Sequence, residues 1–246
     1  MNTDKLVLIT GASSGVGLSL ARHLAGEYRV IAAARRIDRL ENEFGDNPNV
    51  DTIRLDLSDP DEVKRRADEL VGRHGFIGYL VNNAGVNIKA GVQEMDSAQL
   101  AHSFAVNSIS PLVLMQKLLP AMVAHNFGRI INVTSGAPLN CFPGFGAYSA
   151  TKGALNALTV SAARELEEHN IKINLMSPGP VKTEMAPQAP MDPSVAHPTV
   201  EHLLSLPADG PTGRFFWLGR DIPLFPDLSG IEWLEGRAPE RFKRVL

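Results

Sequence analysis

A glycine-rich turn directly after a short apolar run constrains the fold of this chain more than any other feature. Residues 5–10 read Lys-Leu-Val-Leu-Ile-Thr, which is typical of a buried strand, and residues 11–17 read Gly-Ala-Ser-Ser-Gly-Val-Gly. Apolar residues then recur with helical spacing from Leu18 to Ala25, so the turn joins a strand to a helix. Such a turn lets the backbone approach a phosphate, and the free amides of the helix start attract its charge.

This turn predicts a dinucleotide site, although an ordinary strand-to-helix turn has the same pattern in isolation. Its glycine spacing also differs from the commoner G-x-G-x-x-G fingerprint. The hydroxyls of the two serines would add donors to the backbone amides. The contacts predicted for the turn are Gly11, Ser13, Ser14, Gly15, Val16 and Gly17.

The end of the second apolar run indicates which dinucleotide would bind. Residues 28–34 form this run, and Arg35 and Arg36 follow it directly. In this kind of fold an acidic residue near that point binds the ribose hydroxyls of NAD, whereas arginine accommodates the 2′-phosphate of NADP. The planar guanidinium gives phosphate two parallel charge-assisted hydrogen bonds. The pair therefore favours NADP (NADPH), and an exposed basic strand end is the alternative.

Strand and helix signals alternate along the chain without a break in composition, which predicts an α/β fold. We expect one domain over residues 1–246, a Rossmann fold with a doubly wound, seven-stranded parallel sheet and helices on both faces. Ser58, Asp59 and Pro60 offer a helix cap, and a longer helix is expected over 97–125, interrupted by Pro111 and Pro120. The expected strands are residues 5–10, 28–34, 50–55, 78–82, 128–134, 171–177 and 213–218.

Tyr148 and Lys152 are four residues apart, and Ser135 precedes the tyrosine by thirteen. On a helix, residues four apart share a face, so the phenol and the ammonium would project together. A neighbouring positive charge lowers the pKa of a phenol and makes it a usable proton donor and acceptor. Taken alone, the pair is more typical of a solvated helix face.

The chain closely resembles the classical short-chain dehydrogenases/reductases, in particular carbonyl-reductase-like members, over roughly residues 4 to 184. The resemblance depends on the order and spacing of several motifs along one chain. They are Thr10 to Gly17, Asn82-Asn83-Ala84-Gly85, Asn107, Ser135, Tyr148 and Lys152.

The resemblance implies a catalytic set of Asn107, Ser135, Tyr148 and Lys152. Tyr148 would be the general acid in the reducing direction, and Ser135 would hydrogen-bond the substrate carbonyl. Lys152 would bind the nicotinamide ribose and lower the tyrosine's pKa, and Asn107 would hold a water that links the lysine to solvent. The hydride would leave the B face of the nicotinamide.

The resemblance also implies further cofactor contacts. Asn83, Ala84 and Gly85 would lie beside the adenine ribose, and Asp56, followed by Leu57, would bind the adenine amino group. The segment after residue 177 would touch the nicotinamide and its carboxamide. Its implied contacts are Pro178, Gly179, Val181 and Thr183.

The proline-rich stretch 178–198 predicts the loop that covers the substrate, and with it the specificity. Core packing is the alternative for each apolar residue near the carbonyl. The predicted substrate pocket, mostly apolar, comprises Asn87, Pro138, Phe142, Phe145 and Met185, with Met191 a further candidate.

Composition restricts the remaining function classes. A net charge of −3 gives no basic surface for nucleic acid, and we expect no apolar run of the length that a membrane helix needs. The single cysteine, Cys141, excludes an internal disulfide; it would be either a packed small residue or part of the pocket. The histidines lack ligand-like spacing, so we expect no metal. The first strand begins too early for a leader, which predicts a cytoplasmic protein.

Small residues on the helix of Tyr148 favour close packing of a partner helix, and relatives are usually dimers or tetramers, so we expect a homo-oligomer. Residues 221–246 form an extension that many members lack.

The leading hypothesis is an NADPH-dependent reductase of a ketone or aldehyde, which can also run in reverse as an alcohol oxidation. The alternatives are an NAD-dependent secondary-alcohol dehydrogenase of a biosynthetic pathway and a non-catalytic dinucleotide-sensing protein.

Overall fold

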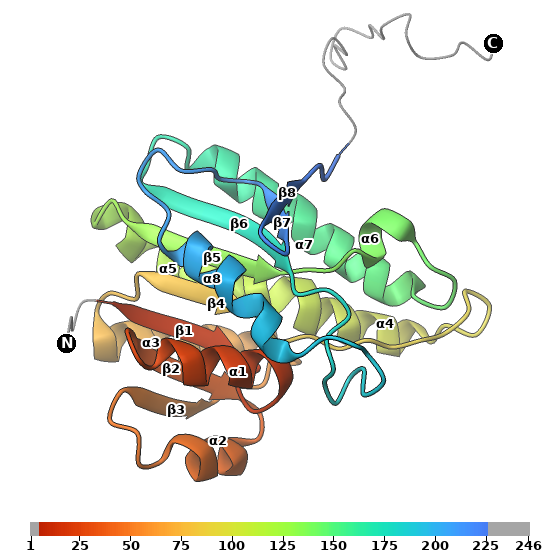
Figure 1. Ribbon diagram of the computed structural model, residues 1–246, viewed down its shortest axis with the longest axis horizontal. Coiled ribbons are helices and arrows are strands. Elements are labelled where there is room, and N and C mark those ends of the chain that lie inside the picture. The colour runs from red at the N-terminus through yellow and green to blue at the C-terminus, as the bar shows by residue number, and fades with distance from the viewer. Residues whose placement is uncertain (1–4, 226–246) are drawn as a thin grey trace, which may run out of the picture.

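An eight-stranded sheet forms the centre of the computed structural model, which describes residues 5–225 (Figure 1). The strand order is β3-β2-β1-β4-β5-β6-β7-β8. Neighbours from β3 to β7 pair in parallel, and β8 pairs antiparallel with β7. The strands are β1 (Leu6–Thr10), β2 (Arg29–Ala34), β3 (Val50–Arg54), β4 (Tyr79–Asn82), β5 (Gly128–Val133), β6 (Ile171–Ser177), β7 (Phe215–Trp217) and β8 (Arg220–Ile222).

The predicted doubly wound sheet and its seven parallel strands are confirmed, and the eighth strand was missed. It is joined to β7 by Leu218 and Gly219, which both have positive φ, as a two-residue hairpin turn requires. Leucine seldom adopts that conformation, so the sequence carries no clear turn signal there. The strand takes up the first residues of the predicted extension; residues 226–246 lie outside the described part of the chain.

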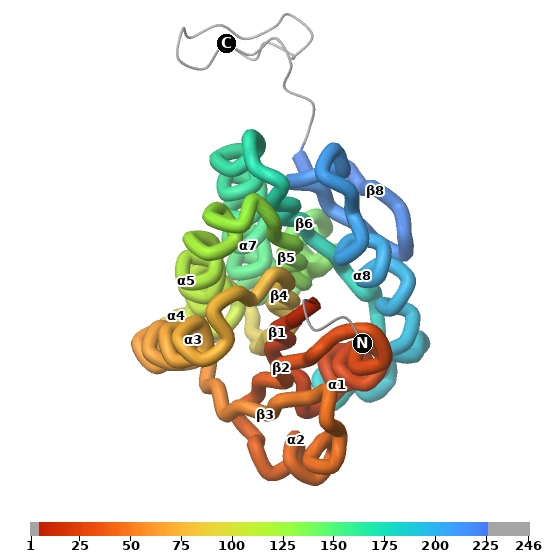
Figure 2. The backbone as a smooth tube through the Cα atoms, turned by 90° about the vertical axis from the view of Figure 1, so that its left-hand side faces the viewer, coloured from red at the N-terminus to blue at the C-terminus, as the bar shows by residue number. Residues whose placement is uncertain are grey.

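Alternate residues of the central strands face opposite sides of the sheet, as the two-residue period of a strand requires. In β1, Val7 and Ile9 belong to one buried cluster, while Leu6 and Leu8 belong to another. Helices α1 (Gly15–Leu24), α2 (Ile37–Phe44) and α8 (His197–Leu204) cover the first cluster. Helices α3 (Pro60–His74), α5 (Ser110–Ala124) and α7 (Gly146–Glu165) cover the second. Figure 2 shows α3, α5 and α7 on the opposite side of the sheet from α1 and α8.

The helix expected over 97–125 is one helical run with an irregular middle. It consists of α4 (Ser97–Phe104), a π-helix (Ala105–Ile109) and α5. Pro111, the second residue of α5, has no N–H to offer the carbonyl four residues before it, that of Asn107 in the π-helix. A π-helical turn at that point accommodates the proline without ending the helix.

By length and composition, the run Ser97–Ala124 could cross a membrane, so the expectation that no segment is apolar enough was wrong. The run nevertheless packs inside the fold. Half of its most apolar window is buried, and α5 lies against α3 and β5. The run is therefore apolar because it is a core helix of the α/β domain.

The capping signal before α3 is confirmed. The carboxylate of Asp59 accepts hydrogen bonds from the amides of Asp61 (3.0 Å) and Glu62 (3.1 Å), and Pro60 begins the helix.

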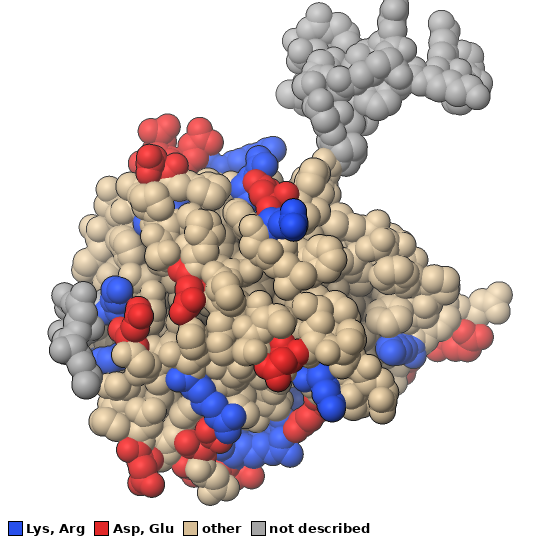
Figure 3. Space-filling model, in the orientation of Figure 1, with Lys and Arg blue, Asp and Glu red and all other residues tan. Residues whose placement is uncertain are grey.

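On the face shown in Figure 3, acidic and basic side chains alternate, and many lie along the lower edge, near α2 in the view of Figure 1. The described part of this face therefore shows mixed charge.

Candidate active site

A cleft of about 460 Å³ lies at the carboxyl ends of the central strands. The chain reverses its winding direction beside β1, since β2 and β3 lie on one side of it and β4 lies on the other. Open α/β sheets bind ligands at this switch point, because the two loops leaving neighbouring strands diverge there. The loops after β1, β2, β4, β5 and β6 all contribute residues to the lining.

The glycine-rich turn forms the floor of the cleft beneath the segment that follows β6. A Cβ on Gly17 would collide with the carbonyl oxygen of Gly11, so only glycine allows the helix to approach the turn this closely. Gly15 has a φ of +56°, and a Cβ there would lie 2.9 Å from the methyl group of Thr183. The turn is thus a bare backbone cradle at the start of a helix, which fits a dinucleotide phosphate.

Asn83 and Ala84, at the end of β4, fix the position of this turn. The side-chain amide of Asn83 donates to the carbonyl of Thr10 (2.9 Å). The hydroxyl of Thr10 in turn accepts from the backbone amides of Asn83 (3.0 Å) and Ala84 (3.1 Å). These bonds connect β1 and β4 at the point where the two strands part, so they hold the opening of the cleft.

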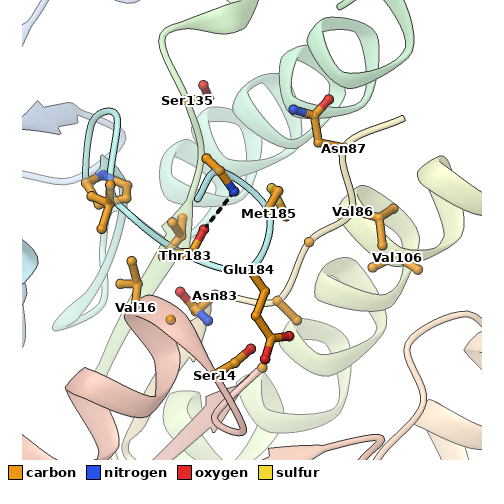
Figure 4. Close-up of a pocket in the computed structure, with 18 of the residues that line it drawn as sticks. Ser14, Val16, Asn83, Val86, Asn87, Val106, Ser135, Thr183, Glu184 and Met185 are labelled. Carbon is orange, nitrogen blue, oxygen red and sulfur yellow. Dashed lines mark hydrogen bonds between the residues drawn. The ribbon is translucent and has the colours of Figure 1, made fainter. Parts of the chain in front are cut away.

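Ser135, Tyr148 and Lys152 meet at the other end of the cleft. Ser135 follows β5, and the other two lie one turn apart on α7. The ammonium of Lys152 donates to the carbonyl of Val133 (2.7 Å) and lies 6.0 Å from the ring centroid of Tyr148. Figure 4 shows Ser135 and Asn87 at one end of the cleft, and Ser14 and Glu184 at the other.

Burial determines the proton affinities at this end. It raises the pKa of Tyr148, because the phenolate would lose its hydration, and the hydrogen bond with Ser135 opposes this only in part. Burial also lowers the pKa of Lys152 to about 8. The sequence predicted a lowered tyrosine pKa, and the structure differs because the phenol is buried and burial outweighs its hydrogen bond with Ser135. At neutral pH the phenol therefore keeps its proton, as a proton donor must.

Asn107 is fully buried behind the cleft and does not line it. Its carbonyl oxygen accepts from the amide of Val86 (2.8 Å), and its NH₂ group donates to the Val86 carbonyl (2.9 Å) and the Thr151 hydroxyl (2.9 Å). The side chain therefore connects the loop after β4 to α7, next to Lys152. Its role in holding a water stays a prediction.

Charged groups gather at the end of β2. Arg35 and Arg36 both line the cleft, and Arg36 donates to the hydroxyls of Ser13 (3.4 Å) and Ser14 (3.0 Å). Asp56 lies nearby and accepts from the amide (3.0 Å) and hydroxyl (2.8 Å) of Ser58. Burial acts to raise the pKa of Asp56, but these bonds and the charges of Arg35 and Arg54 outweigh it, so the pKa is lowered.

Comparison with known proteins agrees with this geometry. The family model described as short chain dehydrogenase matches residues 5–193. The chain belongs to the short-chain dehydrogenase family. It is 37% identical over 184 residues to the uncharacterized oxidoreductase YbbO of Escherichia coli, a match that covers 73% of this chain and 67% of the relative.

Two solved structures extend the comparison to the fold. One is a metagenomic short-chain oxidoreductase in complex with NADP, with a TM-score of 0.77 and 30% identity, covering 87% of this chain and 96% of the other. The second is an NADPH-bound carbonyl reductase from chicken fatty liver, with a TM-score of 0.79 and 26% identity, covering 89% and 98%.

Within this short-chain dehydrogenase, most residues predicted for the site line the cleft. Asn87 does so, and its side-chain oxygen is buried with no hydrogen-bond partner in the described part of the chain. Gly17 lies beneath the turn and outside the lining. The predicted residues that line it are Gly11, Ser13, Ser14, Gly15, Val16, Arg35, Arg36, Asp56, Leu57, Asn83, Ala84, Gly85, Asn87, Ser135, Phe145, Tyr148, Lys152, Pro178, Gly179, Val181, Thr183 and Met185.

Two residues predicted for the substrate pocket lie outside the lining. Pro138 belongs to the short helix α6 (Ala137–Asn140), and Phe142, just after it, is half exposed and meets the edge of Phe145. Cys141 ends α6 with a φ of 48° and is exposed, so it is not a packed residue. Phe142 is exposed where the chain reverses after α6, and the assignment of Pro138 and Phe142 to the substrate pocket stays a prediction.

Only the first part of the predicted substrate loop, 178–198, lines the cleft. Residues 178–181 and 183–186 line the cleft, whereas a 3₁₀ turn (Pro193–Ala196) and α8 pack on α1 and the sheet. Met191 packs against the core beside Val181 instead of facing the cleft. In the described residues, no cluster of three or more His, Cys, Asp or Glu side chains could hold a metal.

Sequence reasoning missed two charged residues, Arg39 and Glu184. Arg39 lies in the first turn of α2, three residues after Arg36, which is the N-cap residue of that helix, and this closeness in sequence could have identified it. Glu184 lies in an irregular segment far along the chain, so no local pattern predicted its approach to these arginines.

Proposed function

We propose that the protein is an NADPH-dependent reductase that converts a ketone or aldehyde to an alcohol and can run in reverse. One observation carries this proposal: the fold brings Ser135, Tyr148 and Lys152 into the same cleft as the glycine-rich cradle and Arg36. A phenol, a hydroxyl and an ammonium at one end suit proton transfer to a carbonyl, and the cradle suits a dinucleotide.

The residues divide the work as follows. A bound nicotinamide supplies the hydride. Tyr148 donates its proton to the carbonyl oxygen, and Ser135 donates a hydrogen bond to the same oxygen, holding it within reach of the phenol. Lys152 places a positive charge beside the phenol, where it stabilises the phenolate left after proton donation. Asn107 holds α7 against the loop after β4 and so positions Lys152.

NADPH is proposed because Arg36 reaches from the end of β2 to the serines of the glycine-rich turn. An arginine there can donate to a 2′-phosphate while it remains anchored. The two solved relatives described with NADP and NADPH support this choice. We include in the proposal the cytoplasmic location and homo-oligomer expected from the sequence.

NAD remains the rival nucleotide, and one observation favours it. Glu184 forms ion pairs with Arg36 and Arg39, so part of the positive charge at this site is neutralised. Free ribose hydroxyls would tolerate that arrangement better than a phosphate would. The rival function is an NAD-dependent secondary-alcohol dehydrogenase with the same catalytic residues.

The proposal is tested by titrating the purified protein with NADPH and NADH, following nucleotide fluorescence. A panel of ketones and aldehydes is then screened with the preferred nucleotide, following its loss of absorbance. Tighter NADPH binding together with turnover of a carbonyl compound is expected. A preference for NADH would favour the rival dehydrogenase. Tight binding with no turnover across the panel would count against the reductase and favour the dinucleotide sensor.

A further inference from the structure

A carboxylate from the segment after β6 bridges two arginines at the end of β2. One oxygen of Glu184 accepts from Arg36 (2.9 Å), and the other accepts from Arg39 (2.6 Å). Arg36 uses its remaining terminal nitrogen for the serine hydroxyls of the glycine-rich turn. The carboxylate therefore occupies donors of the same group to which we assign the 2′-phosphate of NADPH.

The backbone around Glu184 holds the carboxylate in this place. Thr183 and Ala186 exchange backbone hydrogen bonds (3.3 and 3.0 Å), which form a tight turn with Glu184 at its tip. Lys182 donates to the carbonyl of Met191 (2.8 Å), and the methyl group of Thr183 lies over Gly15. Figure 4 shows the Glu184 side chain extending from this segment toward Ser14. The residue that pairs with the two arginines thus lies on a turn whose backbone is held by hydrogen bonds.

Carboxylate and phosphate compete for the same donors. Hydrogen bonds from Arg39 and then Arg36 lower the pKa of Glu184, so its side chain is ionised at neutral pH. A phosphate monoester carries nearly two negative charges at pH 7 and also seeks paired N–H donors. Two anions cannot share these donors without repulsion, so a bound 2′-phosphate must displace Glu184.

We propose that Glu184 is a specificity-determining residue that competes with the 2′-phosphate of NADPH for Arg36 and Arg39. It thereby weakens NADPH binding while leaving NADH binding unchanged, since an adenine ribose without the phosphate does not require these donors. The inference rests on the proposed function in one respect, that the dinucleotide places its adenine ribose at the end of β2. Arg39 becomes a second phosphate ligand once Glu184 is displaced.

The size of the effect follows from exposure. The side chains of Arg36, Arg39 and Glu184 are 40%, 47% and 57% exposed, so water screens both ion pairs. Exposed pairs contribute little, and releasing two of them should change affinity by about three- to fivefold. The effect should shrink as ionic strength rises, because salt screens exposed charges.

The test compares dissociation constants for NADP⁺ and NAD⁺, measured by isothermal titration calorimetry on the full-length protein. Glu184→Gln keeps the size of the side chain and removes its charge. Glu43→Gln is the matched control, because Glu43 pairs with Arg22 away from the cleft. We expect Glu184→Gln to tighten NADP⁺ binding about three- to fivefold, with NAD⁺ binding unchanged and Glu43→Gln without effect on either.

A second variant tests whether the tighter NADP⁺ binding depends on Arg39. In an Arg39→Ala background, the gain from Glu184→Gln should be reduced, because one of its two partners is gone. Unchanged NADP⁺ affinity in Glu184→Gln, weaker NADP⁺ binding, or equal tightening of both nucleotides would overturn this inference alone. If the wild type bound neither nucleotide, the proposed function would fail and this inference with it. Thermal unfolding of each variant shows that it is folded.

Discussion

The two ends of the cleft hold their polar groups in different ways. At the catalytic end, Lys152 is 2% exposed and Asn107 is fully buried, and each is bonded to backbone from a neighbouring element. At the arginine end, the Arg36 and Glu184 side chains are 40% and 57% exposed and are bonded mainly to other side chains. One end is part of the core, and the other is part of the surface.

This difference determines what each end can do. A charge or dipole in the core acts in a low dielectric and is already oriented, so it has a large effect on a reaction. A charge at the surface is screened by water and salt, and its effect is small and adjustable. We infer that chemistry depends steeply on single atoms at the catalytic end, whereas nucleotide preference at the arginine end can change in modest steps.

The largest effect is expected from removing one oxygen at the catalytic end. Tyr148→Phe deletes the proton donor but keeps the ring, so the rate constant kcat should fall by about 10²- to 10⁴-fold. Nucleotide affinity should stay within about twofold, because the variant leaves the cradle and the arginines in place. Steady-state kinetics and nucleotide titration measure the two quantities.

Tyr28→Phe is the matched control for this variant. Tyr28 is buried in the core, edge-on to Tyr79, and does not line the cleft. Its substitution should leave kcat unchanged. Native turnover by the Tyr148 variant would show that another group donates the proton, and the assignment of the catalytic end would then be wrong.

An intermediate effect is expected at the arginine end. Arg36→Ala removes the donors nearest the serines of the turn, so NADPH affinity should fall by roughly 10- to 30-fold. This loss is at the lower end of the range for a charged hydrogen bond because the site is exposed to water. NADH affinity should change little. Titration of both nucleotides measures the ratio, with Arg22→Ala, whose partner is Glu43, as the control. Equal losses for both nucleotides would show that Arg36 supports the turn and does not select the phosphate.

The same contrast explains which parts of the site were predictable from sequence. The seven parallel strands, the cap of α3 and the glycine-rich turn depend on local patterns, namely apolar runs, a cap before proline, and glycine where no Cβ fits. Tyr148 and Lys152 were predictable because helical spacing alone puts them on one face. These features are encoded within a few residues of one another.

Other features depend on contacts between distant segments. Glu184 meets Arg36 across 148 residues of sequence, and Asn107 meets Thr151 across 44. Neither pairing leaves a periodic signal. The pKa of Tyr148 was mispredicted for the same reason, since spacing indicates that an ammonium is near but not that the folded chain buries the phenol.

The smallest effect is expected from pH, and it tests how deeply the catalytic end is buried. Burial lowers the pKa of Lys152 to about 8. The value of kcat/KM for carbonyl reduction should therefore fall about fourfold between about pH 7 and 8.5, as the ammonium loses its proton. A pH profile of the initial rate at low substrate measures this.

Unfolding and ionisation of Tyr148 are the two other possible causes of a loss of rate at alkaline pH, and each can be told apart from deprotonation of Lys152. The pKa of Lys152 is lower in the folded protein than its ordinary value, so the unfolded chain binds more protons above about pH 8, and this group's contribution makes folding more favourable as pH rises. Loss of rate with an unchanged or higher melting temperature would thus be due to the lysine and not to unfolding. Burial raises the pKa of Tyr148, so its ionisation would affect the rate only at a higher pH than that of an ordinary tyrosine. A profile that stayed flat to about pH 10 would show that the charge of Lys152 does not support the reaction.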